Sequence, residues 1–193
     1  MEPVDLHRRT VETWTARVEA VPAARWDAAT PCTDWTVREL VNHVVGEDAW
    51  TVPLVRGATL AEVGSSLDGD LLGDDPAGAA RRLAGEACDA VAEGLRTDGA
   101  KVHLSYGDED LTEYVLQLSA DHLLHAWDLA AATGGDTTLD PELVEEVAGW
   151  FAEREEMYRS AGVVGDRVQA GGGAQEALLG AAGRDASWTP PTR

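Results

Sequence analysis

Between about residue 110 and residue 132, polar side chains recur at helical spacing along an otherwise apolar stretch. Steps of four and three residues place Tyr114, Leu118, Asp121, His125 and Asp128 on one face of a helix. Asp121 and His125, four residues apart, would lie one above the other on that face. A buried charge without a partner is costly, so these side chains need hydrogen-bond partners or a metal ion.

An earlier stretch carries a matching pattern. Leu40, His43, Glu47 and Trp50 follow the same spacing, again apolar at both ends and polar in the centre. Two helices that each bring a histidine and a carboxylate to the interior of a bundle are typical of a metal site. Two imidazoles, one carboxylate and an open coordination position suit Zn²⁺, Ni²⁺ or Fe²⁺. The same residues also fit a buried His–Asp hydrogen bond between helices, or a solvated His–Glu pair.

The other histidines fit this site less well. On a helix, His122 would point about 100° away from Asp121, so we expect it to flank the site or to lie on the surface. His7 and His103 have no polar partner at a useful spacing, and we expect both on the surface.

The two cysteines are too few for a disulfide framework or a cysteine-based zinc site. Cys32 lies in a loop that leads into a predicted helix N-terminus, where a thiolate would be favoured. No histidine or second cysteine is near it in sequence, so we expect a small loop residue. Cys88 lies among alanines of a predicted helix and is expected in the core.

The elements that must position these side chains are helical, because apolar residues recur every three or four positions and long alternating stretches are absent. Two helix starts are well marked. Thr36 with Glu39 three positions later forms a capping box, and Asp140 is followed by Pro141 at the first helical position. The spacing predicts helices over residues 4–21, 36–52, 76–95, 110–132, 141–151 and 174–182. It also predicts an acidic, glycine-rich connection over 56–76 with room for one helical turn, and a short extended piece over 102–107.

Long helices with short links predict an all-α fold, a helical bundle. We expect one domain over residues 1–193, with residues 171–193 forming a C-terminal helix and tail. The core helices should end before the three glycines at 171–173, unless Trp188 folds back onto an apolar face.

The composition excludes several classes of function. The 193 residues include 35 acidic and 15 basic side chains, which give a net charge of −20. Without a basic surface, we expect no binding to nucleic acid or to an anionic membrane. No apolar run reaches the roughly 18–20 residues of a membrane helix, and the N-terminus lacks the apolar stretch of a signal peptide. These features predict a cytoplasmic protein.

Three stretches of the chain, residues 30–47, 120–134 and 178–188, resemble signatures of a known family. They are similar to those of the actinobacterial metal-binding proteins related to mycothiol-dependent maleylpyruvate isomerase, in the short single-domain group. The resemblance covers nearly the whole chain. It implies a DinB-like four-helix bundle with additional C-terminal helices and one divalent metal ion. The implied ligands are His43 from the earlier motif and, from the later one, Asp121 and His125.

The chain departs from the isomerase at two points. The isomerase carries glutamate where this chain has Asp121, whose side chain is one methylene shorter. The isomerase also carries a C-terminal domain, for which 193 residues leave no room. The metal site therefore carries over residue by residue, whereas the isomerase reaction does not follow from these residues.

Relatives in the wider superfamily use the metal to hold a low-molecular-weight thiol as its thiolate. The resemblance thus implies a metal-dependent enzyme, a thiol transferase or an isomerase, with Zn²⁺ favoured over Ni²⁺ or Fe²⁺ and with mycothiol as cosubstrate. Glu47, one turn from His43, is the candidate proton acceptor, and Asp128 is a candidate to orient His125 or a bound water. One alternative is a non-catalytic protein of the same fold that binds a metal or a small ligand. Another is a bundle that has lost its metal and serves in protein contacts. We expect a small-molecule or thiol partner and a monomer or homodimer.

Overall fold

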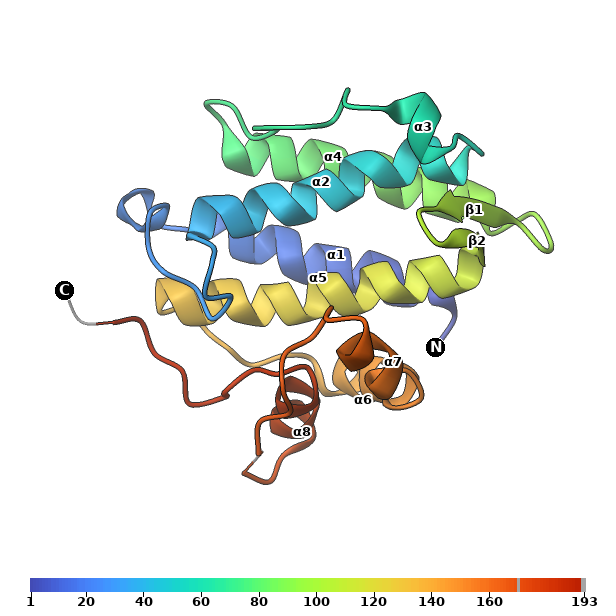
Figure 1. Cartoon of the computed structure of the whole chain (residues 1–193). Helices are drawn as coiled ribbons and strands as arrows, with labels where there is room; N and C mark the ends of the chain where they lie inside the picture. The colour runs from blue at the N-terminus through green and yellow to red at the C-terminus, as the bar shows by residue number, and fades with distance from the viewer. Residues whose placement is uncertain (170, 192–193) are drawn as a thin grey trace.

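The computed structural model describes residues 1–169 and 171–191. Its centre is a bundle of the four long helices α1 (Pro3–Glu19), α2 (Val37–Val55), α4 (Pro76–Gly94) and α5 (Leu111–Thr133). Helix α1 packs against α4 and α5, and α2 packs against the same two helices, so the four form a closed ring (Figure 1). The predicted all-α four-helix bundle is confirmed.

The ends of the helices follow local sequence signals. At the start of α2, the Thr36 side chain accepts a hydrogen bond from the Glu39 backbone, and the Glu39 carboxylate accepts one from the Thr36 backbone. At its C-terminus, α5 ends at Gly134, whose φ of 76° lies in the left-handed region that favours glycine. Because these signals fix the start of α2 and the end of α5, they fix which turn of each helix carries His43 and His125.

Short elements join the long helices. A 3₁₀ turn (Ala23–Arg25) follows α1, and the single turn α3 (Leu60–Val63) lies in the connection after α2. Strand β1 (Lys101–Leu104) pairs antiparallel with β2 (Gly107–Asp110). The prediction of one extended piece was therefore incomplete. The second strand was missed because its sequence, Gly-Asp-Glu-Asp, has no apolar alternation, and it forms by pairing with β1.

The C-terminal part of the chain forms α6 (Pro141–Ala152), α7 (Glu155–Ser160) and α8 (Ala174–Ala181). These helices lie on the side of α5 away from α4 (Figure 1). Leu178 and Leu179 of α8 are 2% and 0% exposed and share a hydrophobic cluster with Leu123 of α5 and Leu143 of α6.

The expectation that the core ends before residues 171–173 is therefore wrong. An eight-residue helix such as α8 is not stable alone, and it forms because its apolar face packs against α6. Trp188 packs partly buried against the same cluster, which is the alternative that the sequence left open. Within the described residues, no helix combines the length and the apolar character that crossing a membrane requires.

Candidate metal centre

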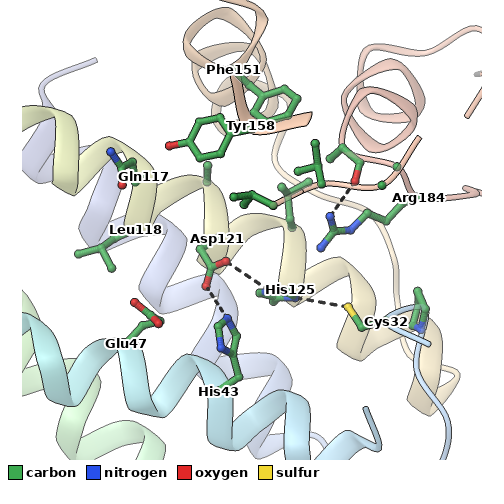
Figure 2. Close-up of a pocket in the computed structure, with 18 of the residues that line it drawn as sticks. Cys32, His43, Glu47, Gln117, Leu118, Asp121, His125, Phe151, Tyr158 and Arg184 are labelled. Atoms are coloured by element: carbon green, nitrogen blue, oxygen red, sulfur yellow. Dashed lines mark hydrogen bonds and ion pairs between the residues drawn. The ribbon is translucent and has the colours of Figure 1, made fainter. Parts of the chain in front are cut away.

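Helices α2 and α5 bring three predicted ligands together. His43 on α2 faces Asp121 and His125 on α5 (Figure 2). Asp121 Oδ1 lies 3.3 Å from His125 Nε2, and Asp121 Oδ2 lies 3.7 Å from His43 Nε2. One nitrogen or oxygen atom from each residue lies within 4.8 Å of the other two. The helical spacing predicted the pair on α5, and the packing of α2 against α5 adds the third residue.

The Asp121 carboxylate fits a cation at this point. Among the described residues, its Oδ2 atom is buried and has no hydrogen-bond partner, since 3.7 Å to His43 is too long for one. A buried carboxylate oxygen without a partner is costly. Two imidazoles and a carboxylate are a donor set that Zn²⁺ accepts in catalytic sites. The three side chains therefore fit a divalent metal ion.

The opposite edge of the His125 ring is held by Asp128. His125 Nδ1 lies 2.9 Å from Asp128 Oδ2, and Asp128 is completely buried. The same oxygen accepts a hydrogen bond of 3.1 Å from Arg184 Nη2 and one of 3.4 Å from the Cys32 thiol. A carboxylate on one ring nitrogen orients the other nitrogen of a histidine toward a metal. Here the Asp128 bond directs Nε2 toward Asp121 and His43.

A second group of possible ligands shares His125. Atoms of Cys32, His125 and Asp128 also lie within 4.8 Å of one another. This group would bind a metal through His125 Nδ1, the nitrogen that Asp128 already occupies. The guanidinium of Arg184 sits on the same carboxylate, and its positive charge opposes a metal ion there. The geometry therefore favours the group of His43, Asp121 and His125.

Cys32 and Arg184 were not predicted at the site. Cys32 Sγ lies 3.9 Å from His125 Nδ1, although 93 positions separate them in sequence. Arg184 lies 56 positions from Asp128 and reaches it from the segment after α8. No local pattern could indicate these contacts. The sequence signal that could have found them was the family resemblance, because Cys32 lies in the motif over residues 30–47 and Arg184 in the motif over residues 178–188.

The charges at the centre stabilise one another. Burial alone would lower the pKa of His125, but the Asp121 carboxylate outweighs it and raises that pKa well above its ordinary value. Burial alone would raise the pKa of Asp121, but His125 and then His43 lower it well below its ordinary value. Without a metal, the carboxylate and the imidazole thus form an ion pair. A bound cation would take the place of the imidazole proton.

These residues line a pocket of about 740 Å³. The loop at residues 31–35 and the facing sides of α2 and α5 form part of it, aromatic side chains of α6 and α7 form a second part, and the segments 163–165 and 182–184 complete it. Glu47, one turn after His43, lines the pocket as predicted (Figure 2). Burial, and then the negative charge of Asp121, raise the pKa of Glu47 above its ordinary value.

Two histidines that were expected on the surface are buried, so the prediction for His7 is wrong and, for His122, only the alternative of a residue flanking the site remains. His122 is 0% exposed, with Nε2 3.1 Å from Asp48 Oδ1 and Nδ1 bonded to the Leu118 carbonyl. Burial opposes charge on this ring, but Asp48 outweighs it and raises the pKa of His122. His7 is 1% exposed, packs edge-on against the His122 ring, and has its pKa lowered by burial to about 3. The sequence missed the burial of His122 because its partner, Asp48, lies 74 positions away. It missed that of His7 because this ring packs against His122 from another helix.

The remaining two residues lie close to where they were predicted. His103 is partly exposed on the hairpin, and it has a partner that was not expected, since its Nδ1 lies 2.6 Å from Asp108 Oδ1. Cys88 is partly rather than fully buried, 3.9 Å from His7 Nδ1, and burial raises the pKa of its thiol to about 12.

The Asp128 contact leads to a measurable expectation. Asp128→Asn keeps the shape of the side chain but removes the charge that orients His125. Loss of such a partner lowers metal affinity by about 10- to 100-fold. We expect a fall of that size in the Zn²⁺ affinity measured by isothermal titration calorimetry. Asp108→Asn, which changes a carboxylate beside the surface histidine His103, should leave the affinity unchanged. Equal affinities for the two folded variants would contradict the role of Asp128.

Comparison with known proteins identifies the family of the chain and a solved structure of similar fold. The family model described as "Mycothiol maleylpyruvate isomerase N-terminal domain" matches residues 7–130. Two uncharacterised proteins of Mycobacterium tuberculosis, from two strains, are each 31% identical over 167 residues, which cover 84% of this chain and 85% of theirs. The crystal structure of a mutant of mycothiol-dependent maleylpyruvate isomerase has a similar fold. Its TM-score is 0.58 at 17% identity, over 86% of this chain and 73% of that one.

Proposed function

Since the chain belongs to the family of the mycothiol maleylpyruvate isomerase N-terminal domain, we propose that it is a metal-dependent enzyme that acts with a low-molecular-weight thiol. The reaction is a thiol transfer or an isomerisation, and mycothiol is the proposed thiol. One observation carries the proposal. Ligand atoms of His43, Asp121 and His125 lie within 4.8 Å of one another beside a pocket, and the Asp121 Oδ2 atom has no hydrogen-bond partner among the described residues.

His43, Asp121 and His125 would hold one divalent metal, for which we propose Zn²⁺. Such an ion lowers the pKa of a thiol or water bound to it, so that a nucleophile is present at neutral pH. Asp128 would keep the His125 ring in one orientation through the Nδ1 hydrogen bond of 2.9 Å. The centre of the Trp35 ring lies 4.6 Å from that of the His43 ring, so the indole packs against this proposed ligand.

A test of the thiol proposal uses the protein loaded with Co²⁺. A cobalt–thiolate bond absorbs in the near ultraviolet, and the ligating thiol must first lose its proton. We expect mycothiol to produce this band and to release a proton on binding, and we expect the same additions to His125→Ala to produce neither. A metal-loaded protein with no spectral response to mycothiol or to other cellular thiols would contradict thiol chemistry. That result would favour the non-catalytic binding protein.

Glu47 is the proposed proton acceptor. It lies on the pocket side of α2, one turn from His43, and its pKa is raised above the ordinary value, the direction that favours a proton acceptor. Because Glu47 is outside the group of ligand atoms, Glu47→Gln should leave Zn²⁺ affinity unchanged. Loss of a general base slows turnover by about 10²- to 10⁴-fold. We expect the rate of conjugate formation with mycothiol to fall by that factor in Glu47→Gln.

Asp34→Asn is the matched control for this experiment. It also removes one carboxylate from the pocket lining, but from the loop at residues 31–35 rather than from the α2 face that carries His43. If both variants slow turnover equally, the effect is one of general charge and Glu47 is not the acceptor.

A further inference from the structure

The wall of the pocket opposite α2 is aromatic. Phe151 and Tyr158 lie across the pocket from His43 and Glu47, with Asp121 between them (Figure 2). The rings of Phe151 and Tyr158 are 6.0 Å apart and 22° from parallel. Trp150 extends the wall, with its ring 5.9 Å from that of Tyr158. We call Trp150, Phe151 and Tyr158 the aromatic wall.

The N–H group of Trp150 and the charged side chains behind it are already paired. Trp150 Nε1 donates a hydrogen bond of 3.1 Å to Glu113, and Arg154 holds the same carboxylate through an Nη2 bond of 2.7 Å. Neither Glu113 nor Arg154 lines the pocket. The indole therefore offers carbon atoms rather than its N–H group to a ligand.

Within the part of the chain that the structure describes, no free cation lies beside the aromatic wall to pair with an anionic ligand, because the two histidines of the site lie across the pocket, with Asp121 between them and the wall (Figure 2). Asp34, Glu47 and Asp121 are carboxylates, and Arg184 is the only arginine in the lining among the described residues. Its Nη2 atom donates to Asp128, and its Nη1 atom donates to the Ala182 carbonyl. A carboxylate placed against the aromatic wall would lose its hydration without gaining a positive partner, which is costly.

We propose that the aromatic wall binds an uncharged aromatic group of the second substrate. The compound that reacts with the thiol is then a neutral, apolar molecule. The thiol part of this statement rests on the proposed function, whereas binding to the wall is testable without turnover. A volume of about 740 Å³ lies in the usual range for small-molecule sites and leaves room for a ring beside the metal residues.

Two probes that share one ring system test the charge preference. Isothermal titration calorimetry with 2-naphthalenemethanol and with 2-naphthoate should be run on the Zn²⁺-loaded protein and on protein treated with a chelator. In the protein treated with a chelator, we expect the neutral probe to bind at least tenfold more tightly than the carboxylate. In the Zn²⁺-loaded protein a carboxylate can also ligate the metal, so there we expect only that the neutral probe binds as tightly as it does without Zn²⁺. Equal binding of the two probes, tighter binding of the carboxylate, or no binding of either probe in the chelator-treated protein would overturn the proposal.

Three variants locate the binding. Tyr158→Ala should weaken the neutral probe by about two- to tenfold, the loss expected for one aromatic contact, and Tyr158→Phe should restore it. Gln117→Arg adds a cation to the pocket lining and should tighten binding of 2-naphthoate. Thr97→Arg adds the same charge at an exposed position outside the pocket and should change nothing. A similar gain in both arginine variants would show that net charge, not the pocket, sets the preference.

The probe-binding experiment and the metal and cobalt–thiol experiments can fail independently of each other. Loss of the neutral-probe preference with intact Zn²⁺ binding and an intact cobalt–thiol band overturns only the aromatic wall. Preference for the neutral probe in a protein that binds no metal overturns the metal-dependent function and leaves the wall as a binding surface.

Discussion

We expect His125→Ala and His43→Ala each to lower Zn²⁺ affinity by more than about 100-fold. Loss of a residue that only orients a metal ligand lowers the affinity by up to about that factor, and loss of the ligand itself should lower it further. Each substitution removes one of three side chains whose ligand atoms lie within 4.8 Å of one another. The remaining two cannot complete the donor set of a three-ligand site. Calorimetry gives the affinity, and native mass spectrometry gives the stoichiometry, which we expect to be about one ion per chain.

Two other histidines serve as controls with different outcomes. His103→Ala changes a surface residue of the hairpin and should leave metal binding and melting temperature unchanged. His122→Ala leaves Asp48 as a buried charge without its partner, which typically costs about 3–5 kcal/mol of stability. We expect it to lower the melting temperature rather than to remove a ligand. Equal loss of Zn²⁺ affinity in folded His122→Ala and His125→Ala would contradict the assigned ligands.

Ending the chain after Gly171 should abolish cooperative unfolding. The truncation removes Leu178 and Leu179, whose burial contributes about 1.5–3 kcal/mol each. It also removes Arg184, the only arginine bonded to the buried Asp128 within the described residues. The two leucines alone account for about 3–6 kcal/mol, a large part of the 5–15 kcal/mol of a typical domain. Circular dichroism during heating would show a broad transition in place of a sharp one.

A shorter truncation is the matched control. Ending the chain after Thr189 keeps α8, Arg184 and Trp188. Of the described residues it removes only Pro190 and Pro191, which belong to none of the core clusters. This protein should melt as the full chain does. A sharp transition at an unchanged temperature in the Gly171 truncation would show that α8 does not belong to the core.

The sequence by itself determined the four long helices, α6 and α8, and the position of each proposed ligand along them, whereas α7 lies where a loop was expected. Capping is local, so Thr36 with Glu39 marked the start of α2, and Asp140 marked the start of α6. A step of four residues is one turn of helix, so Asp121 and His125 had to share a face of α5. The assignment of His43 as their partner needed the second polar pattern and the family motif together.

Only the tertiary structure decided which side chains meet across the bundle. Periodicity shows which residues share a helix face, but it does not show which neighbour that face contacts. His122 and Asp48 are buried together because α2 and α5 pack with those positions turned inward. The local sequence around His122 is equally compatible with a position on the surface. Likewise, Arg184 reaches Asp128 only because α8 packs against α6 and returns the chain to α5. A buried polar side chain requires a partner, and when that partner comes from another element, tertiary packing decides which residue it is.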